Sequence, residues 1–286
     1  MNDSPLARPV VLATIAGTRS ALADRGNVVL VPTMGALHEG HIALVQRALE
    51  LGGTVVVSIF VNPLQFGPNE DLDRYPRDLE ADLDKLHRLG VPFVFAPSVE
   101  EMYPSGPPQT TVKAGPVGSM YEGRSRPGHF DGMLTVVSKL VNIVRPTSVI
   151  FGQKDAQQVY LVRRMLADLN EPVRVEVVET VRDDTGLALS SRNRFLDARE
   201  TRAARALSQA LDAAESSADQ GIDAVIAASQ GTLMGESLVQ LDYLKIVHPD
   251  TFLPVDDGYK GAALVIVAAR VGSIRLIDNA FIVLAG

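Results

Sequence analysis

The first 180 residues alternate between short apolar runs and segments in which apolar residues recur at helical spacing. Continuous runs rich in Val and Ile predict buried strands, whereas apolar residues three and four positions apart predict helices. The expected strands are 27–32, 54–61, 92–96, 148–151 and 173–178, and the expected helices are 40–51, 77–89, 134–144 and 157–169. Strands of this kind, separated by helices of this length, predict an α/β fold with a parallel sheet covered on both faces.

The pattern changes after about residue 180. Helices are expected over 198–221 and 223–233, followed by strands at 239–247, 262–270 and 274–277. Helices followed by strands with short turns are typical of an α+β domain with a mostly antiparallel sheet. We therefore expect two domains, a Rossmann-like domain at 1–180 and a smaller α+β domain at 181–286.

Two stretches do not fit this alternation. Residues 104–127 are rich in Gly and Pro without periodicity, so we expect either a functional flap or a poorly ordered connection there. Residues 10–16 form a short apolar stretch that matches a signal peptide only weakly. Apolar runs such as 262–269 fall far below the roughly 18 residues that a membrane helix needs, so we expect no membrane partner.

Composition narrows the classes of function. The chain has 286 residues, 46% of them hydrophobic, and a formal net charge of −7. A protein that grips nucleic acid should carry a basic surplus, so nucleic acid is a poor candidate for a partner. The sequence contains no Cys, which excludes disulfides, thiolate nucleophiles and Cys-ligated zinc. We expect an acidic, globular, cytoplasmic protein.

The candidate chemistry begins at His38-Glu39-Gly40-His41, where a predicted strand becomes a predicted helix. Residues three apart share one helix face, and a helix N-terminus attracts phosphate. Gly35 and Gly40 let the backbone approach a ligand closely. Two surface histidines near a turn would explain either ring alone, but the combination favours a phosphate site. A zinc site would need a third ligand, which the other three histidines do not obviously supply.

Two further segments offer groups for phosphate. Lys154 and Asp155 follow the predicted strand that ends near Gly152, as a counter-charge and a helix N-cap; an ordinary capped turn explains them equally well. Residues 189–192 (LSSR) offer two hydroxyls and a guanidinium, although a polar turn would explain them alone. Ligands of open α/β sheets bind beyond the carboxyl ends of the strands, where the HEGH segment, the LSSRN segment and residues 62–65 are all predicted.

Asn62 and Gln65 also follow a predicted strand, and their amides suit a hydroxyl or carboxylate. The chain contains neither a P-loop nor a G-x-G-x-x-G fingerprint nor a G-x-S-x-G elbow. Those absences argue against kinase-type phosphoryl transfer, a nicotinamide enzyme and a serine hydrolase.

HEGH and LSSRN resemble the HIGH and KMSKS motifs of the nucleotidyltransferase superfamily, which includes class I aminoacyl-tRNA synthetases. Within it, the chain is most similar to the pantoate–β-alanine ligase (pantothenate synthetase) family. Six blocks match in order and spacing over essentially the whole chain: PTMGALHEGH at 32–41, FVNPLQF at 60–66, YPRDLEADL at 75–83, RPGHFDG at 126–132, FGQKDAQQ at 151–158 and GLALSSRN at 186–193. Gln153 and Leu189 depart from the family's frequent Glu and Met, and neither change removes a phosphate donor.

The resemblance implies a two-step ligation. The carboxylate of pantoate attacks the α-phosphorus of Mg-ATP to give pantoyl adenylate and pyrophosphate, and the amine of β-alanine then displaces AMP. It also implies a homodimer. The Mg²⁺ ligands stay unknown; Asp82 is a possible contributor, although phosphates and waters commonly hold this ion.

The resemblance also implies residue roles. His38 and His41 would contact the triphosphate, with His41 the donor to developing charge. Catalytic partners on the phosphates would be Lys154, Ser190, Ser191 and Arg192. The rest of the nucleotide site would comprise Met34, Gly35, Gly40, Gly152, Asp155, Val181 and Leu189. Pantoate would be held by Gln65 and Gln158, with Asn62 and Met34 near the intermediate and Arg126 contributed by the flap.

Other classes stay open at this point. An adenylyltransferase that moves AMP onto a phosphorylated cofactor precursor would share the HxGH motif. An aminoacyl-tRNA synthetase fits less well, because the chain is short and acidic. A module without activity would bind ATP and release no pyrophosphate. For the ligase, we expect the second domain to close over the first, because its LSSR loop must reach the phosphates.

Overall fold

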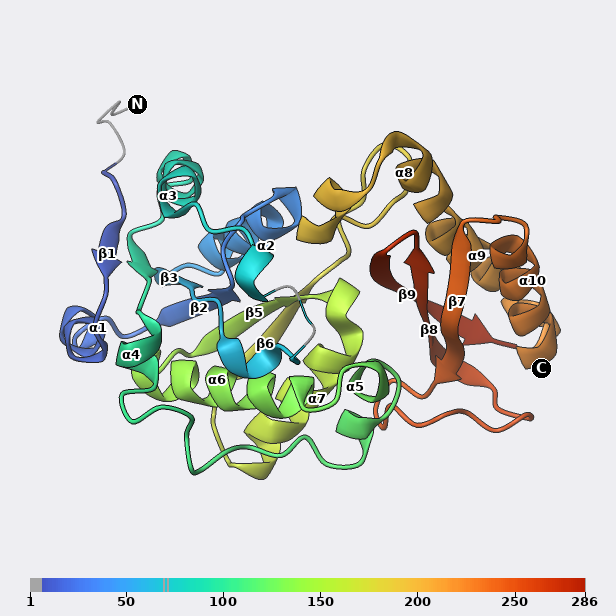
Figure 1. Cartoon of the computed structure of the whole chain (residues 1–286). Helices are drawn as coiled ribbons and strands as arrows, with labels where there is room; N and C mark the ends of the chain where they lie inside the picture. Colours follow the sequence, from blue (N-terminus) through green and yellow to red (C-terminus); the bar gives the residue numbers. More distant parts are fainter. Residues whose placement is uncertain (1–6, 69, 71, 286) are drawn as a thin grey trace. The chain divides into compact units, whose positions relative to one another are not determined.

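The chain forms two compact units, drawn in Figure 1 from a computed structural model that describes residues 7–68, 70 and 72–285. The first unit comprises the described residues up to Gly152 together with Leu161–Val178, and the second comprises Gln153–Tyr160 and the described residues from Glu179 onward. Each unit has its own hydrophobic core. The division at residue 180 stays a prediction.

A six-stranded parallel sheet forms the centre of the first unit, with the strand order β1-β4-β3-β2-β5-β6. Its strands are β1 (Val10–Leu12), β2 (Val28–Thr33), β3 (Thr54–Ile59), β4 (Phe93–Phe95), β5 (Ser148–Gly152) and β6 (Arg174–Val178). The parallel sheet predicted from the apolar runs is therefore confirmed. The order of connection reverses at β2, which lies between β3 and β5; in open sheets such a switch point opens a ligand crevice beyond the strand ends.

Helices cover both faces of this sheet (Figure 1). They are α1 (Ile15–Leu22), α2 (Glu39–Glu50), α3 (Leu79–Arg88), α4 (Val99–Met102), α5 (Glu122–Ser125), α6 (His129–Val144) and α7 (Ala156–Asp168). The buried faces of α2 and α3 join one core with β2, β3 and β4. Short 3-10 turns η1 (Pro63–Gln65), η2 (Leu72–Arg74) and η3 (Val117–Ser119) lie in the connections.

The structure places elements in both stretches of this unit that did not fit the alternation. The stretch 10–16 supplies β1 and the start of α1, which Thr14 caps by accepting a hydrogen bond from the N–H of Gly17. The segment 104–127 contains η3 and α5 and is tied to α6: Val112 N–H donates to Thr135 Oγ1 and Ala114 N–H to Asp131 Oδ1. Hydrogen bonds to side chains of α6 therefore hold this segment, although its sequence has no periodicity typical of a helix or strand.

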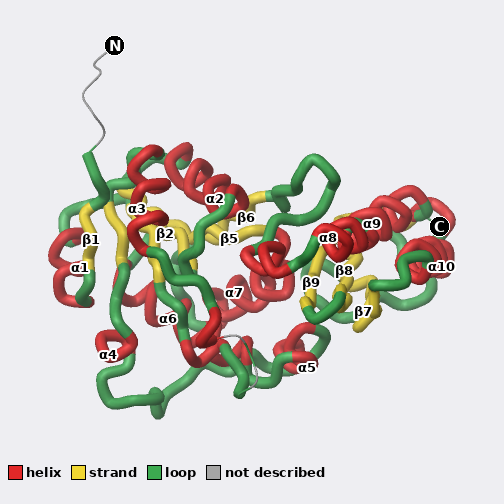
Figure 2. Tube along the Cα trace, turned by 45° about the horizontal axis from the view of Figure 1, so that its top comes forward, coloured by secondary structure: helices red, strands yellow, loops and turns green. Residues whose placement is uncertain are grey.

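The second unit contains a three-stranded antiparallel sheet, as predicted, in the order β7-β8-β9. The strands are β7 (Val239–Val247), β8 (Gly261–Val271) and β9 (Ile274–Leu284), and the helices are α8 (Ala198–Ala204), α9 (Ala206–Ser216) and α10 (Ile222–Met234). Helices α9 and α10 lie side by side (Figures 1 and 2). Turns η4 (Gln153–Asp155), η5 (Ser191–Phe195) and η6 (Ala218–Gln220) complete this unit.

Two predicted elements of the second unit were wrong in extent. The single helix expected over 198–221 is divided at Arg205 into α8 and α9, and α9 ends at Ser216 instead of continuing to Gly221. Strand β9 continues to Leu284 instead of ending at 277, because the polar pair Asp278 and Asn279 is buried within it. Across the described residues, no helix has the length and apolarity to cross a membrane.

Candidate active site

The two histidines of the HEGH segment cap the beginning of α2. His38 is the N-cap, and its Nδ1 accepts a hydrogen bond from the N–H of Gly40 at 3.2 Å. His41 Nδ1 accepts one from the N–H of His38 at 3.3 Å. A ring nitrogen that accepts a backbone N–H carries no proton, so each neutral ring holds its proton on Nε2. The ring centroids lie 4.1 Å apart, and the helix N-terminus therefore carries two adjacent Nε2–H donors.

The turn that leads into α2 is held from another helix. The carboxylate of Asp82, on α3, accepts the N–H groups of Ala36 and Leu37, each at 2.8 Å. Asp82 was considered from the sequence as a possible contributor to the magnesium site. In the structure both of its oxygens bind the backbone of this turn.

Asn62 and Gln65 follow β3 along the chain, and their side-chain amides form a buried chain of hydrogen bonds. Asn62 Oδ1 accepts the hydroxyl of Tyr103 at 2.8 Å and the N–H of Leu64 at 3.4 Å. Asn62 Nδ2 donates to the carbonyl of Gly132 and to Gln65 Oε1, both at 3.0 Å. Burial raises the pKa of the Tyr103 hydroxyl, so it stays protonated and donates.

Arg126 belongs to a second network around Gln65. Its guanidinium donates to both carboxylate oxygens of Glu70, at 2.9 and 2.6 Å, and to the carbonyl of Gln65 at 3.3 Å. His129 Nδ1 contacts the same carbonyl at 2.9 Å, while its Nε2 lies 3.1 Å from Arg126. A carbonyl only accepts and a guanidinium only donates, so His129 is the neutral Nδ1–H tautomer. Burial, followed by the charge of Arg126, lowers the pKa of His129 to about 4.

In the second unit, Lys154 lies on η4, directly after the chain leaves β5. Asn279 of β9 holds the backbone of this turn: its Nδ2 donates to the carbonyls of Gln153 and Lys154, each at 2.9 Å, and its Oδ1 accepts Gln153 Nε2 at 3.0 Å. Lys154 Nζ lies 3.6 Å from Asp155 Oδ1. The lysine thus extends from a turn whose main chain is anchored by a buried amide.

The LSSRN segment of the second unit starts from a small hairpin. Leu189 N–H donates to the carbonyl of Val181 at 2.9 Å, which joins two residues predicted for the nucleotide site. Ser190 caps η5 by accepting the N–H of Arg192 at 3.2 Å. The hairpin is fixed to β9, because Arg182 donates to both oxygens of Asp278, at 2.6 and 3.0 Å.

The remaining predicted residues occupy the same segments. Met34 and Gly35 lie between β2 and α2, Gly40 lies in the first turn of α2 beside the two histidines, and Gly152 is the last residue of β5. Gln158 is on α7, and Ser191 begins η5. Sequence reasoning did not single out Tyr103, His129 or Asn279. Only Asn279 left a signal, as a polar residue inside an apolar strand; the roles of the other two depend on contacts between distant segments.

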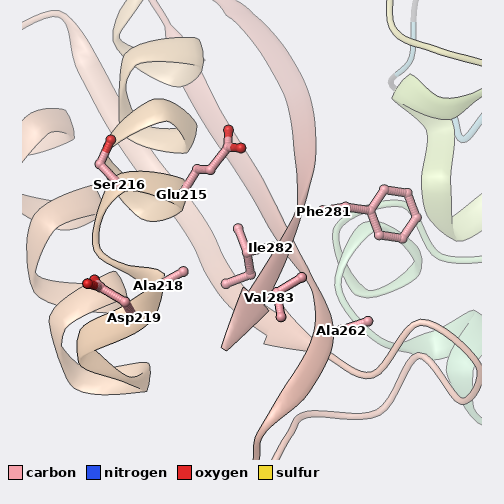
Figure 3. Close-up of a pocket in the computed structure, with 8 residues that line it drawn as sticks. All are labelled: Glu215, Ser216, Ala218, Asp219, Ala262, Phe281, Ile282 and Val283. Carbon is pink, nitrogen blue, oxygen red and sulfur yellow. The ribbon is translucent and has the colours of Figure 1, made fainter. Parts of the chain in front are cut away.

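A separate cavity of about 420 Å³ in the second unit does not suit a triphosphate. Figure 3 shows it beside β9, where Phe281 and Ile282 point in different directions. The lining side chains include acidic Glu215 and Asp219 but no Lys or Arg. In the described residues, no group of three or more His, Cys, Asp or Glu side chains is placed to hold a metal ion.

The switch point at β2 and the paired histidines at the N-terminus of α2 place the chain among nucleotide-binding α/β proteins of the HxGH type. A family model described as pantoate-beta-alanine ligase matches residues 10–281. The chain belongs to this ligase family, and the family resemblance stated from its six sequence blocks is confirmed.

Individual relatives that match nearly the whole chain support this family membership. A pantothenate synthetase of Leifsonia xyli subsp. xyli is 58% identical over 267 residues, which are 93% of this chain and 92% of the relative. The crystal structure of pantothenate synthetase from Thermus thermophilus is similar with a TM-score of 0.89 and 48% identity, over 94% of this chain and 98% of that one. Pantoate-beta-alanine ligase from Francisella tularensis, solved with beta-gamma ATP and beta-alanine, gives a TM-score of 0.77 and 33% identity, over 95% and 97% of the two chains.

Proposed function

We propose that this enzyme joins pantoate to β-alanine at the expense of ATP, forming pantothenate through a pantoyl adenylate and releasing AMP and pyrophosphate. The observation that carries the proposal is the pair of Nε2–H imidazoles at the start of α2, in a chain of the pantoate-beta-alanine ligase family. Imidazole donors at a helix N-terminus suit an ATP phosphate chain.

In the first step, a pantoate carboxylate oxygen attacks the α-phosphorus, and the bond from that phosphorus to pyrophosphate breaks. Negative charge grows on the phosphate oxygens, where fixed donors lower the barrier. We assign His38 and His41 to these oxygens from the first unit, with His41 the donor to the developing charge. From the second unit we assign Lys154, Ser190, Ser191 and Arg192.

We assign the acid to the amide chain of the first unit. Gln65 accepts from Asn62 through Oε1, so its Nε2–H groups are the donors it can offer to a pantoate oxygen. Gln158 is proposed as the second amide on pantoate, and Asn62 and Met34 as neighbours of the adenylate. The guanidinium of Arg126 is paired with Glu70 and also donates to the carbonyl of Gln65, and we propose that it borders the pantoate side of the site.

The remaining assignments concern the rest of the nucleotide. At Gly35, Gly40 and Gly152 the absence of a side chain leaves room for ATP close to the backbone, and Met34 borders the turn that contains Gly35. Asp155, Val181 and Leu189 are proposed to line the nucleoside.

Magnesium fits this site as an ion carried by ATP. The proposed phosphate-binding residues are imidazole, ammonium, guanidinium, hydroxyl and N–H donors, and Asp82 is bound to the backbone. Such a set leaves Mg²⁺ to phosphate oxygens and waters, as is common for this ion. When bound, it supplies neutralisation of the phosphate charge.

In the second step, the β-alanine amine attacks the pantoyl carbonyl, and the bond from that carbonyl to the AMP oxygen breaks. The amine loses a proton and AMP leaves as an anion, so no covalent bond to the enzyme is required. The protein contributes positioning and charge stabilisation. We also propose that the enzyme is a cytoplasmic homodimer, as the family resemblance implies.

The test is ATP–pyrophosphate exchange with Mg²⁺ and pantoate alone, β-alanine alone, or neither. Exchange that needs pantoate but not β-alanine is expected, because the adenylate forms before the amine reacts. Exchange only with a phosphorylated acceptor would instead support an adenylyltransferase, and ATP binding without any exchange would leave a nucleotide-binding module.

A further inference from the structure

The turn between β2 and α2 has an unfavourable backbone conformation. Gly35 has a φ of +79° and Ala36 a φ of +51°. Glycine adopts such angles readily, but a non-glycine residue there is strained and persists only where its surroundings hold it. Leu37 follows, and His38 then begins the cap of α2. The contacts that hold residues 35–37 therefore determine the position of the two imidazole rings.

Asp82 holds this turn from α3, more than forty residues further along the chain. Its Oδ2 accepts the N–H of Ala36 and its Oδ1 accepts the N–H of Leu37, both at 2.8 Å. Lys85, one helical turn later, donates its Nζ to the carbonyl of Leu37. Three hydrogen bonds from one helix therefore fix three consecutive peptide groups, at the point where the left-handed turn ends.

The carboxylate is buried, with only 2% of the residue exposed. A buried carboxylate is costly unless it is hydrogen-bonded or paired. Burial raises the pKa of Asp82, whereas the N–H groups of Leu37 and Ala36 and the charge of Lys85 act against that rise. The turn and the carboxylate thus stabilise each other.

Gly35 completes the arrangement. A Cβ at this position would lie 3.0 Å from Asp82 Oδ2 and 3.0 Å from Ile59 Cγ2. That distance is too short for ordinary packing, and the positive φ adds strain. The first glycine of the PTMGALHEGH block, Gly35, is therefore matched to the second aspartate of the YPRDLEADL block, Asp82.

We infer that Asp82 is a positioning residue that sets the direction of the His38 and His41 Nε2–H groups by fixing the turn before them. The inference rests on the proposed adenylate-forming function. Misplacement of catalytic groups by about 1 Å can cost on the order of 100-fold in rate, so a rigid turn has a direct catalytic value. Asp82 acts through the histidines and not on the substrate.

The test compares Asp82→Asn with Asp84→Asn. The amide introduced by Asp82→Asn keeps one acceptor and turns an NH₂ group toward a backbone N–H, while the shape is unchanged. Asp84 lies on the same helix, where it is exposed and paired with Arg8, so the control makes the same charge change without touching the turn. The readouts are the kcat of pantoate-dependent ATP–pyrophosphate exchange, the KM for pantoate, the Mg²⁺ dependence, and the ¹⁵N NMR spectra of the histidine rings.

For Asp82→Asn we expect a kcat about 10- to 100-fold lower, a pantoate KM within about twofold of the wild type because Asn62 and Gln65 lie on other elements, and altered His38 and His41 ring signals. Asp84→Asn should match the wild type. A wild-type kcat in Asp82→Asn would overturn the inference. Recovery by excess Mg²⁺ would overturn it too, in favour of a metal ligand, and so would a pantoate KM that rises as much as kcat falls.

Lys85→Met keeps the inference testable if Asp82→Asn does not fold, because it leaves both bonds from Asp82 to the turn in place while it removes the bond to the Leu37 carbonyl and the Lys85 charge. It should lower kcat by a smaller factor than Asp82→Asn, and an unchanged kcat would count against the turn's role. If the wild type shows no pantoate-dependent exchange, the proposed function fails. The ring spectra of the ligand-free protein still decide whether Asp82 or Lys85 positions the histidines.

Discussion

Asn62 determines which end of the Gln65 amide is presented to a ligand, because its Nδ2 donates to Gln65 Oε1 at 3.0 Å. The orientation of the Asn62 amide is in turn fixed by two backbone groups, an N–H that can only donate a hydrogen bond and a carbonyl that can only accept one. Its Oδ1 accepts the N–H of Leu64, and its Nδ2 donates to the carbonyl of Gly132. Gln65 must therefore direct its Nε2–H groups away from Asn62, as a site for an anionic or hydroxyl oxygen requires.

Replacing Tyr103 with Phe should loosen this orientation. The change removes the hydroxyl that donates to Asn62 Oδ1 at 2.8 Å, and a hydrogen bond of this kind is worth about 0.5–1.5 kcal/mol. We expect the KM for pantoate to rise about 3- to 10-fold, from the same range of free energy, while the KM for ATP changes little. Steady-state kinetics would check this against Tyr259→Phe, whose hydroxyl binds the carbonyl of Ala262 in the second unit. An unchanged pantoate KM would refute the role of Tyr103.

Gly132→Ala should disturb the same amides by steric overlap. A Cβ at Gly132 would lie 2.0 Å from the carbonyl oxygen of Leu64 and 3.0 Å from Gln65 N. Overpacking of this kind costs about 1–3 kcal/mol, and relief by shifting η1 would move Gln65. We expect both a lower free energy of unfolding and weaker pantoate binding. In Gly231→Ala the new Cβ meets nothing within 4 Å, so that control should be neutral or stabilising; equal losses in the two variants would contradict the explanation.

His41→Ala and Lys154→Ala should each abolish most adenylate formation. Loss of one fixed donor to transition-state charge typically costs about 2.7–4 kcal/mol, or roughly 100- to 1000-fold in rate. Pantoate-dependent pyrophosphate exchange measures the loss, and circular dichroism should show an intact fold. Lys260→Ala, at an exposed position, controls for the charge change. Near-wild-type turnover in either variant would remove that residue from the proposed machinery.

Asn279→Ala should impair the enzyme through Lys154. The substitution removes three hydrogen bonds, the two from Asn279 Nδ2 to the carbonyls of Gln153 and Lys154 and the one that Asn279 Oδ1 accepts from Gln153 Nε2. It frees the turn while keeping the lysine itself. We expect exchange kcat to fall less than in Lys154→Ala, together with a stability loss of about 1–3 kcal/mol. Asn142→Ala, which removes an exposed amide on α6, should behave like the wild type. A destabilised Asn279→Ala enzyme with full kcat would show that the contact is purely structural.

His129 should make the folded state less stable in mild acid. Its pKa is lowered to about 4 by burial and by Arg126, with Glu70 and Glu122 acting in the opposite direction. The unfolded chain, with a histidine pKa near 6.5, binds the proton first, so stability falls as the pH drops from about 6.5 toward 4. This group can contribute up to roughly 3 kcal/mol. Urea unfolding of His129→Gln at pH 7, 5.5 and 4.5 should show a flatter pH dependence than the wild type; an identical dependence would contradict the assignment.

The sequence predicted most of the sheet because apolar runs and helical spacing are local properties. Strands β2 and β3 are buried on both faces, so their composition alone identifies them. Strand β9 was predicted too short for the opposite reason, since Asp278 and Asn279 bind Arg182 and η4 from within an apolar strand.

The candidate site was predictable where its residues are neighbours in the sequence. His38 and His41 identify themselves by their spacing at a strand end. Asp82 and Tyr103 do not, because each acts on a segment about forty residues away in the chain. Their roles depend on how the chain folds back, which local pattern does not encode.

The passage of the chain between its two units has a consequence for recombination between related genes. Residues 153–160 belong to the second unit, although they stand in the sequence between two parts of the first. A chimera joined only at residue 178 would pair Asn279 of one parent with the η4 turn of another. Crossovers that exchange 153–160 together with the chain after 178 should keep these partners matched, and should yield active enzymes more often than single crossovers.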